Sequence, residues 1–430
     1  MNTSIVSGWL PVVVRALAVV TLVLAVDRHP RRWRRQLGLG VLLAVAVTVA
    51  GALVLTFGTQ VSADVPRSAY GWGSVFVLAV WVALTGWKRA GLVRRLAAVA
   101  AVLLTLLVTL GTVNQQSDTF PTVGRLVTLD PEHVVDIPNL QEIRDRVAAT
   151  GALPAHGVVI EVTIPPTVSH FSTRPAYVYL PPAWFARITP SLPTLVLLPG
   201  EPGSAADWSD AGDADNTADA FAQAHRGSAP IIVMPDPNGL ATDDSECVDS
   251  TFGNAETYLV QDVPAYARSR FHASTSPGSL AIAGLSAGGT CSLMLALRHP
   301  TVYPTFASYS GFSFPQYEET SRTETIDTLF GGSKANFDAH DPMLLLQQGH
   351  FDGLAGWFEV GDRDTQPLQA ARSLEPAALK AGIATCLLVR PGGHDYDLWS
   401  QALVDSFPWL AWRLGLIAQP THEPATCRSP

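Results

Sequence analysis

The N-terminal quarter of the chain contains four apolar stretches, each close to the length of about 20 residues that crosses a bilayer as a helix. They lie at residues 9–26, 37–57, 74–87 and 96–113. The pattern therefore predicts a segment of four transmembrane helices over residues 1–113. The first stretch is the weakest because Arg15 lies within it, and an arginine deep in a span costs a few kcal/mol.

A secretory signal peptide is the alternative interpretation of the first stretch. It is disfavoured because the charges follow the apolar run and no small-x-small cleavage site is evident.

Basic residues between the stretches predict the orientation of the chain. The sequence "DRHPRRWRRQ" follows the first stretch and "WKRAGLVRR" follows the third, whereas the loop after the second has only Arg67. Such basic loops remain in the cytoplasm. We therefore expect a multi-pass protein of the plasma membrane, with everything after about residue 114 extracytoplasmic, whether or not the first stretch spans.

From residue 157 onward, short apolar or β-branched runs alternate with helical stretches. Runs of this length without an in–out alternation are typical of strands buried on both faces of a mostly parallel sheet. The pattern predicts a doubly wound α/β domain over residues 157–418, preceded by a linker at 114–156 with one short helix and followed by a tail at 419–430. The eight strand candidates lie at 157–164, 176–180, 194–200, 230–236, 279–284, 305–311, 353–361 and 385–390.

The distribution of charge also separates the N-terminal apolar segment from the rest of the chain. Up to Asp118 there are 11 basic and 3 acidic residues, and the remainder has 17 basic and 34 acidic residues. An acidic domain without a basic stripe is repelled by phosphate backbones, which argues against a nucleic-acid partner. A channel or transporter is also disfavoured, because Arg15 is the only charge deep in any span and transport sites need several intramembrane polar groups.

The four cysteines all follow the last predicted span, in a compartment where disulfides form. Three pairings are open, and four free thiols are the alternative. No His/Cys/Asp cluster has the spacing of metal ligands, so the sequence predicts neither a metal nor another cofactor. The cysteines are Cys247, Cys291, Cys386 and Cys427.

Residues 284–288 form the pattern G-x-S-x-G, centred on Ser286. A strand candidate precedes it and a helix candidate follows, and a sharp turn between the two needs residues without a bulky Cβ. Such a turn exposes the serine hydroxyl at the carboxyl edge of the sheet. A serine hydroxyl attacks only when a base takes its proton, and the base is oriented by a carboxylate. The alternative is a glycine-rich turn with an ordinary serine.

A base and an acid are both found downstream. His394 lies in "PGGHDYDLW" on a glycine-rich loop after the last strand candidate, although a lone loop histidine is otherwise most often a solvated surface residue. The acid is expected in "GWFEVGDRDTQP", where Asp364 is preferred and Asp362 is the alternative. Of the other histidines, His299 is interpreted as the partner of a helix C-terminus, and His272 and His350 are backups.

Two backbone N–H groups are expected to form an oxyanion hole, one from the residue after the nucleophile and one from a loop after an earlier strand. These are the N–H groups of Ala287 and of Glu201 or its neighbour in "LVLLPGEPGS". Losing one such donor costs about 100- to 1000-fold in rate.

With these residues identified, the segment 158–418 resembles the bacterial putative-esterase family of α/β-hydrolases, which includes esterase D-like enzymes and secreted mycolyltransferases. The resemblance rests on "LLPGEPGSAADW", "ETYLVQDVPAY", "AGLSAGGTCSLMLALRHP", "VGDRD" and "GGHDYDLW". It implies Ser286 as nucleophile, Asp364 as acid and His394 as base, with Glu201 and Ala287 as oxyanion donors.

The resemblance also implies a disulfide between Cys247 and Cys291, which leaves Cys386 and Cys427 as the second pair. One departure concerns the oxyanion loop, where mycolyltransferases typically carry Asp-Gly and this chain has Pro199-Gly200. The departure argues against mycolyl transfer and leaves ester chemistry intact.

The sequence therefore predicts a membrane-anchored, extracytoplasmic serine ester hydrolase that works through an acyl-enzyme. A tether concentrates the enzyme in the plane of the membrane, so a membrane lipid or cell-envelope ester is the expected substrate. An acyltransferase to a lipid or sugar hydroxyl is one alternative. A catalytically inactive binding or scaffold protein is the other.

Overall fold

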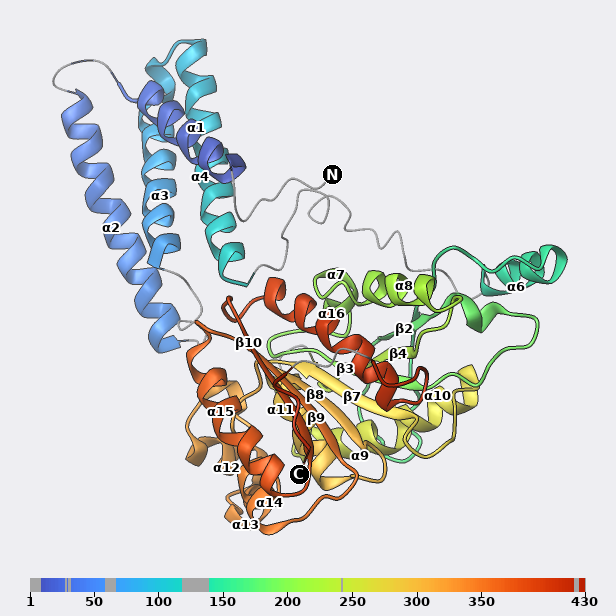
Figure 1. Ribbon diagram of the computed structural model, residues 1–430. Coiled ribbons are helices and arrows are strands. Elements are labelled where there is room, and N and C mark those ends of the chain that lie inside the picture. Colours follow the sequence, from blue (N-terminus) through green and yellow to red (C-terminus); the bar gives the residue numbers. More distant parts are fainter. Residues whose placement is uncertain are drawn as a thin grey trace. The chain divides into compact units, whose positions relative to one another are not determined.

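The structure, a computed structural model, describes residues 9–27, 29, 32–58, 67–117, 139–240, 243–420 and 425–429 (Figure 1). The chain divides into two compact units, residues 1–130 and residues 131–430. Of the linker expected at 114–156, residues 118–138 lie outside the described part. Its short helix is present as α6 (Asn139–Thr150).

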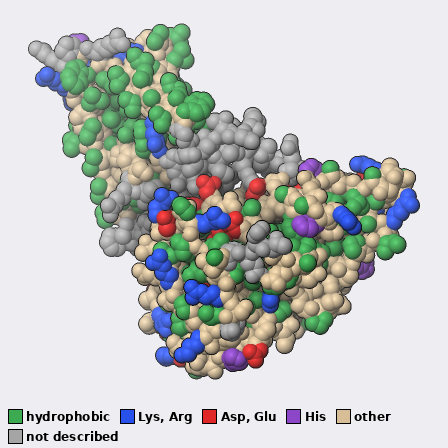
Figure 2. All heavy atoms as spheres, viewed as in Figure 1, with side chains coloured by type: hydrophobic (Ala, Val, Ile, Leu, Met, Phe, Trp, Pro, Cys, Tyr) green, Lys and Arg blue, Asp and Glu red, His purple; other side chains and the backbone are tan. Residues whose placement is uncertain are grey.

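The first unit contains four apolar helices: α1 (Trp9–Ala25), α2 (Arg32–Gly58), α3 (Arg67–Gly86) and α4 (Leu92–Ser117). Helix α4 packs against α1 and α3, and α3 also packs against α2. Large apolar side chains such as those on α2 and α4 point outward, and apolar atoms cover much of the visible face of this unit (Figure 2). An outward-facing apolar surface of this kind is typical of helices that lie in lipid.

Three of the four helices are long and apolar enough to cross a membrane, over residues 32–53, 68–89 and 92–113. The second, third and fourth predicted spans match these helices, and the first, the weakest of the four, corresponds to the shorter apolar helix α1. Helix α1 has 17 residues and so measures about 25 Å, against about 30 Å for a hydrocarbon core. The helix ends at Ala25, just before the polar segment that opens with Asp27.

All eight predicted strands are present in the second unit and form one sheet. The order across the sheet is β1-β2-β4-β3-β7-β8-β9-β10, and only the pairings of β2 with β1 and with β4 are antiparallel. The central strands are buried on both faces, as their continuous apolar runs predict. The strands are β1 (Val158–Val162), β2 (Ala176–Leu180), β3 (Thr194–Leu198), β4 (Ile231–Met234), β7 (Leu280–Leu285), β8 (Thr305–Tyr309), β9 (Ala355–Gly361) and β10 (Ala384–Arg390).

Helices cover both faces of the sheet, so the second unit has three layers (Figure 1). One face packs against α7 (Asp207–Asp210), α8 (Ala214–Ala224) and α16 (Tyr396–Arg413). The other packs against α10 (Val263–Phe271), α11 (Ala287–Arg298) and α15 (Thr365–Lys380). The unit is therefore an α/β-hydrolase-type domain with a mostly parallel sheet.

Between β8 and β9 the chain forms three short helices that the apolar pattern did not predict. They are α12 (Arg322–Phe330), α13 (Lys334–Asp338) and α14 (Pro342–Gln348). Each begins after a side chain that accepts a hydrogen bond from a backbone N–H group of the first turn, and such a cap is a local signal of a helix start. The capping residues are Ser321, Ser333 and Asp341.

Candidate active site

Ser286 lies at the turn between strand β7 and helix α11. Its backbone has φ 55° and ψ −122°, a region that non-glycine residues rarely adopt. The turn needs its glycines, because a Cβ at Gly284 would lie 2.3 Å from the Gly288 oxygen, and a Cβ at Gly288 would lie 2.3 Å from the Pro199 oxygen. The predicted nucleophile turn is thus formed as the pattern indicated.

The structure brings the three predicted side chains together. Ser286 Oγ lies 2.8 Å from His394 Nε2, and His394 Nδ1 lies 2.9 Å from Asp364 Oδ2. The parallel strands β7, β9 and β10 end at the same edge of the sheet, so the loops that follow them meet there. Asp364 is only 6% exposed, and an imidazole donor satisfies this buried carboxylate.

The alternative acid, Asp362, does not contact the histidine ring. It is exposed, and its Oδ1 accepts a hydrogen bond of 3.1 Å from the backbone N–H of Gly392. Asp362 therefore fixes the loop that carries His394, and Asp364 is the carboxylate that meets the ring.

His299 and His350 have partners away from Ser286. His299 follows α11 as expected, but its Nε2 lies 2.6 Å from the carboxylate of Glu256. His350 pairs with Asp352 at 2.9 Å and is largely exposed. His272 ends α10 in a left-handed conformation.

Two aromatic rings beside His394 were not predicted from the sequence. The ring of Trp399 meets the imidazole edge-on at a centroid distance of 4.8 Å, and the ring of Phe312 lies at 5.8 Å. Trp399 belongs to α16, which begins directly after the histidine loop. Trp399 lies in the first turn of α16, so the only sequence signal for this contact is its closeness to His394 along the chain.

The loop after β3 passes directly over the nucleophile. A Cβ at Gly200 would lie 3.2 Å from the Cβ of Ser286, so the backbone of this loop approaches the serine closely. Glu201 follows Gly200, and Asp207 closes the loop by accepting hydrogen bonds from the backbone and hydroxyl of Ser204 at 3.0 and 2.9 Å. We call residues 199–203 the oxyanion loop.

The N–H group of Ala287 opens α11 and so has no carbonyl one turn earlier in that helix. Both predicted donors therefore belong to segments that lie next to Ser286. The positive end of the α11 dipole also favours negative charge at this place.

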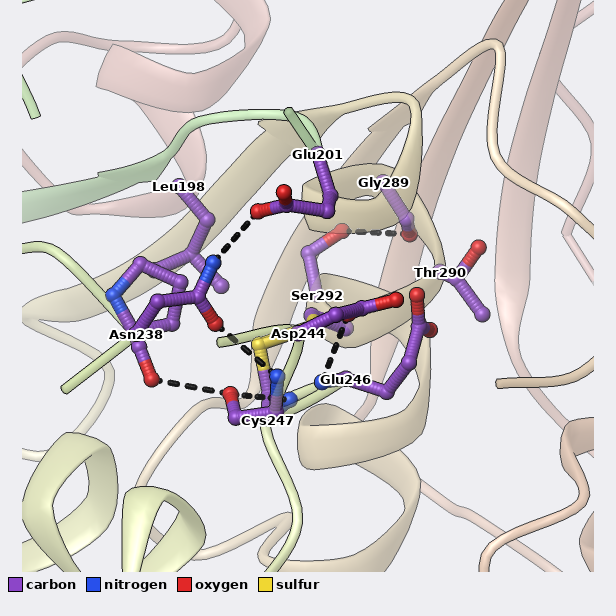
Figure 3. Close-up of a disulfide and its surroundings, with 12 residues drawn as sticks. Leu198, Glu201, Asn238, Asp244, Glu246, Cys247, Gly289, Thr290 and Ser292 are labelled. Atoms are coloured by element: carbon purple, nitrogen blue, oxygen red, sulfur yellow. Dashed lines mark hydrogen bonds between the residues drawn. A yellow bond between two sulfur atoms is a disulfide. The ribbon is translucent and has the colours of Figure 1, made fainter. Parts of the chain in front are cut away.

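Buried carboxyl groups lie beneath the oxyanion loop (Figure 3). Asn238 Nδ2 donates a 2.5 Å hydrogen bond to Glu201 Oε2. Burial, together with the charges of Asp244 and Asp236, raises the pKa of Glu201 to about 8, although Arg174 and Asn238 oppose the shift. Burial and the neighbouring Asp244 likewise raise the pKa of Glu246 well above its ordinary value. This cluster of buried carboxyl groups was not predicted from the sequence, because nothing in the local pattern of its members indicates burial.

Both pairs of cysteines form disulfides, Cys247–Cys291 and Cys386–Cys427. The first joins α11, one turn beyond Ser286, to the segment that contains the buried acids. The second joins β10 to the C-terminal tail, which also pairs with the strand through the backbones of Thr385 and Arg428. In the tail expected at 419–430, residues 421–424 and 430 lie outside the described part.

Apolar N-terminal helices and two disulfides are compatible with a membrane-anchored extracytoplasmic protein.

Across the described ranges, no group of three or more His, Cys, Asp or Glu side chains is placed to hold a metal ion.

Comparison with known proteins gives consistent results. The sequence model of the family described as "Putative esterase" matches residues 171–410. An uncharacterized protein of Corynebacterium glutamicum is 32% identical over 96% of this chain and 98% of its own length. Among solved structures, a ferulic acid esterase matches with a TM-score of 0.54 and 21% identity, covering 60% of this chain and 98% of its own. An S-formylglutathione hydrolase from Agrobacterium tumefaciens matches with a TM-score of 0.52 and 19% identity, covering 61% and 98%.

Proposed function

Because this chain belongs to the family described as "Putative esterase", we propose that it is a membrane-anchored serine ester hydrolase with Ser286 as its nucleophile. The observation that carries the proposal is the pair of contacts made by His394, 2.8 Å to Ser286 Oγ and 2.9 Å to Asp364 Oδ2. Nucleophile, base and orienting carboxylate in hydrogen-bond reach of one another are the requirement for acyl transfer through a serine.

In the proposed reaction, His394 Nε2 takes the proton of the Ser286 hydroxyl as its oxygen attacks an ester carbonyl carbon. Asp364 accepts the hydrogen bond from Nδ1–H and stabilises the imidazolium. The N–H groups of Ala287 and Glu201 stabilise the negative carbonyl oxygen. The ester C–O bond then breaks, the departing alkoxide takes the proton from His394, and an acyl-enzyme remains. Water attacks the acyl-enzyme with the same proton transfers and releases the acid.

We further propose that the domain acts outside the cytoplasm, on a membrane lipid or cell-envelope ester. The basic loops beside the apolar helices and the two disulfides support this location. The membrane tether supports the substrate class, because anchoring raises the effective concentration of esters in the same plane.

The first experiment labels intact cells that produce the protein with a membrane-impermeant fluorophosphonate. Wild type is expected to be labelled, and Ser286→Ala and His394→Ala are expected to lose the label. Ser269→Ala and His350→Ala change exposed residues of the same types and are expected to keep it. Labelling of wild type only after lysis contradicts the extracytoplasmic location. Absence of labelling before and after lysis contradicts the hydrolase and favours an inactive binding or scaffold protein.

The second experiment compares substrates with purified full-length enzyme in detergent. Long-chain acyl glycerol esters are expected to be cleaved with a higher kcat/KM than p-nitrophenyl acetate, and the reverse preference contradicts a lipid substrate. Adding a hydroxyl acceptor such as trehalose or glycerol tests the second half-reaction. Free fatty acid as the main product supports a hydrolase, whereas a new ester identifies an acyltransferase.

A further inference from the structure

Asn238 lies beneath the oxyanion loop, outside the three residues of the proposed mechanism. We infer that Asn238 is a positioning residue that acts through the Glu201 carboxyl to hold the Glu201 backbone N–H toward the oxyanion formed at Ser286. This inference rests on the proposed function and adds to it a residue that touches neither substrate nor nucleophile.

The side chain of Asn238 is buried, only 4% exposed, and its amide has one possible orientation. Its Oδ1 accepts a 2.9 Å hydrogen bond from the backbone N–H of Ser245, so the oxygen must face Ser245. The Nδ2 group therefore faces Glu201, where it donates at 2.5 Å. An amide fixed at one end in this way presents a donor of defined position to the carboxyl.

The segment that fixes Asn238 is tied to the nucleophile helix (Figure 3). The Ser245 hydroxyl donates to the carbonyl of Pro237 at 2.8 Å and accepts from the N–H of Cys247 at 3.1 Å. Cys247 is bonded to Cys291, one turn into α11. A continuous chain of contacts thus connects the Glu201 carboxyl to the helix that begins directly after Ser286.

The Glu201 side chain needs a partner of this kind. Gly200 gives the loop a residue without a Cβ where it passes Ser286, so the loop has no side-chain anchor at that point. The next side chain, Glu201, is turned toward Asn238 (Figure 3). A second fixed point follows in the chain, where Ser204 donates to Asp207. Removing the Asn238 contact takes away the hydrogen bond that holds the Glu201 carboxyl.

The experiment measures kcat and KM for p-nitrophenyl butyrate with full-length enzyme in detergent. Asn238→Ala and Glu201→Ala are each expected to lower kcat by about 10- to 100-fold, with KM within about twofold of wild type, because an oxyanion contact strengthens in the transition state. The double variant is expected to lose no more than about twofold beyond the worse single variant, because the two side chains act as one unit. Glu201→Gln keeps an oxygen that accepts a hydrogen bond from the Asn238 amide. Its kcat is expected to be at least fivefold higher than that of Glu201→Ala.

A matched control and a labelling step separate the possible outcomes. Asn254→Ala removes an asparagine that donates to a backbone carbonyl elsewhere, and it is expected to leave kcat unchanged. If wild type reacts with fluorophosphonate and Asn238→Ala keeps the wild-type kcat, the inference is overturned while the proposed function stands. The inference is also overturned if the fold-loss in kcat of the double variant equals the product of the losses of the two single variants. If wild type fails to react, the proposed function itself is overturned.

Discussion

The indole ring of Trp399 stands perpendicular to the imidazole of His394, at an interplanar angle of 89° and a centroid distance of 4.8 Å. Trp399 is buried in α16, and the edge-on arrangement is one that aromatic pairs prefer. Because His394 is partly exposed on a loop, this ring limits the positions that the imidazole can take between Ser286 and Asp364.

Replacing the ring is expected to lower the rate through the position of the base. We expect Trp399→Ala to reduce kcat/KM per active site by about tenfold, because small displacements of a catalytic group are costly. Active sites are counted by fluorophosphonate titration, which separates rate from folding. Trp409 lies in the same helix and is equally buried, but its ring contacts Trp357, so Trp409→Ala is the matched control for lost packing. Equal rates per site in the two variants contradict the prediction.

The second prediction concerns the contact between Gly288 and the oxyanion loop. A methyl group at Gly288 would lie 2.3 Å from the Pro199 oxygen and 2.5 Å from the Leu198 oxygen, both of them backbone atoms. We expect Gly288→Ala to displace the loop and lower kcat for p-nitrophenyl butyrate by about 100-fold. Gly38→Ala adds a methyl group to open space and is expected to change nothing. Wild-type activity in Gly288→Ala contradicts the prediction.

How much of this site can be predicted from the sequence depends on how far apart along the chain the contacting residues lie. The eight strands follow from apolar runs, and the turn at Ser286 follows from glycines that no other residue can replace. The sequence places His394 after a strand end, and its ring lies 2.8 Å from Ser286 Oγ because parallel strands bring their carboxyl ends to one edge. These features are local in sequence or follow from the topology.

Asn238 and the buried acids could not be predicted in the same way. Glu201 and Asn238 are 37 residues apart, and neither lies in a periodic pattern that indicates burial. The helices α12 to α14 escaped prediction because each is too short to show an amphipathic period. The stretch at residues 9–26 forms α1, an apolar helix shorter than the other three, and the sequence marks it as the weakest span through Arg15.

The third prediction compares the two disulfides. Each closes a loop of about 40 residues, so removing either is expected to cost about 4 kcal/mol of unfolding free energy. Only Cys247–Cys291 joins α11, the helix that begins directly after Ser286, to the segment that contains Asn238. We therefore expect the double replacement of Cys247 and Cys291 by serine to lower the rate per active site severalfold, and that of Cys386 and Cys427 to leave it unchanged. Equal rates in both double variants contradict this assignment.

The fourth prediction follows from the raised pKa of Glu201, about 8 against an ordinary 4.5. Between these values the folded protein holds a proton that the unfolded chain has lost, so the contribution of Glu201 to stability falls as pH rises through this window. Glutamine stays neutral throughout. We expect the melting temperature of Glu201→Gln to rise relative to wild type between pH 5 and pH 9. A difference that is constant with pH contradicts a neutral Glu201 at low pH.

The last prediction concerns Glu256, whose carboxylate joins three basic side chains at the end of α11. Arg298 Nε and His299 Nε2 both lie 2.6 Å from Oε1, and His340 Nε2 lies 2.9 Å from Oε2. Burial alone would raise the pKa of Glu256, but these hydrogen bonds lower it well below its ordinary value. A lowered pKa stabilises the fold above the ordinary pKa of 4.5, and this contribution is lost as pH falls below it.

Glu256→Gln removes the charge and is expected to cost about 1.5–3 kcal/mol at pH 7, the usual worth of hydrogen bonds to a charged group. At pH 3 the difference in unfolding free energy between wild type and variant is expected to be smaller. Below pH 4.5 the carboxylate of the unfolded chain takes up a proton, so the lowered pKa of Glu256 stabilises the folded state less. Thermal unfolding of the full-length protein in detergent at the two pH values checks both statements. The control is Glu142→Gln, an exposed residue of α6, which is expected to change stability by less than about 0.5 kcal/mol. A stability difference that widens toward pH 3 has the wrong sign for a carboxylate whose pKa is lowered by hydrogen bonds, and it would assign the stabilisation to packing around Glu256 instead.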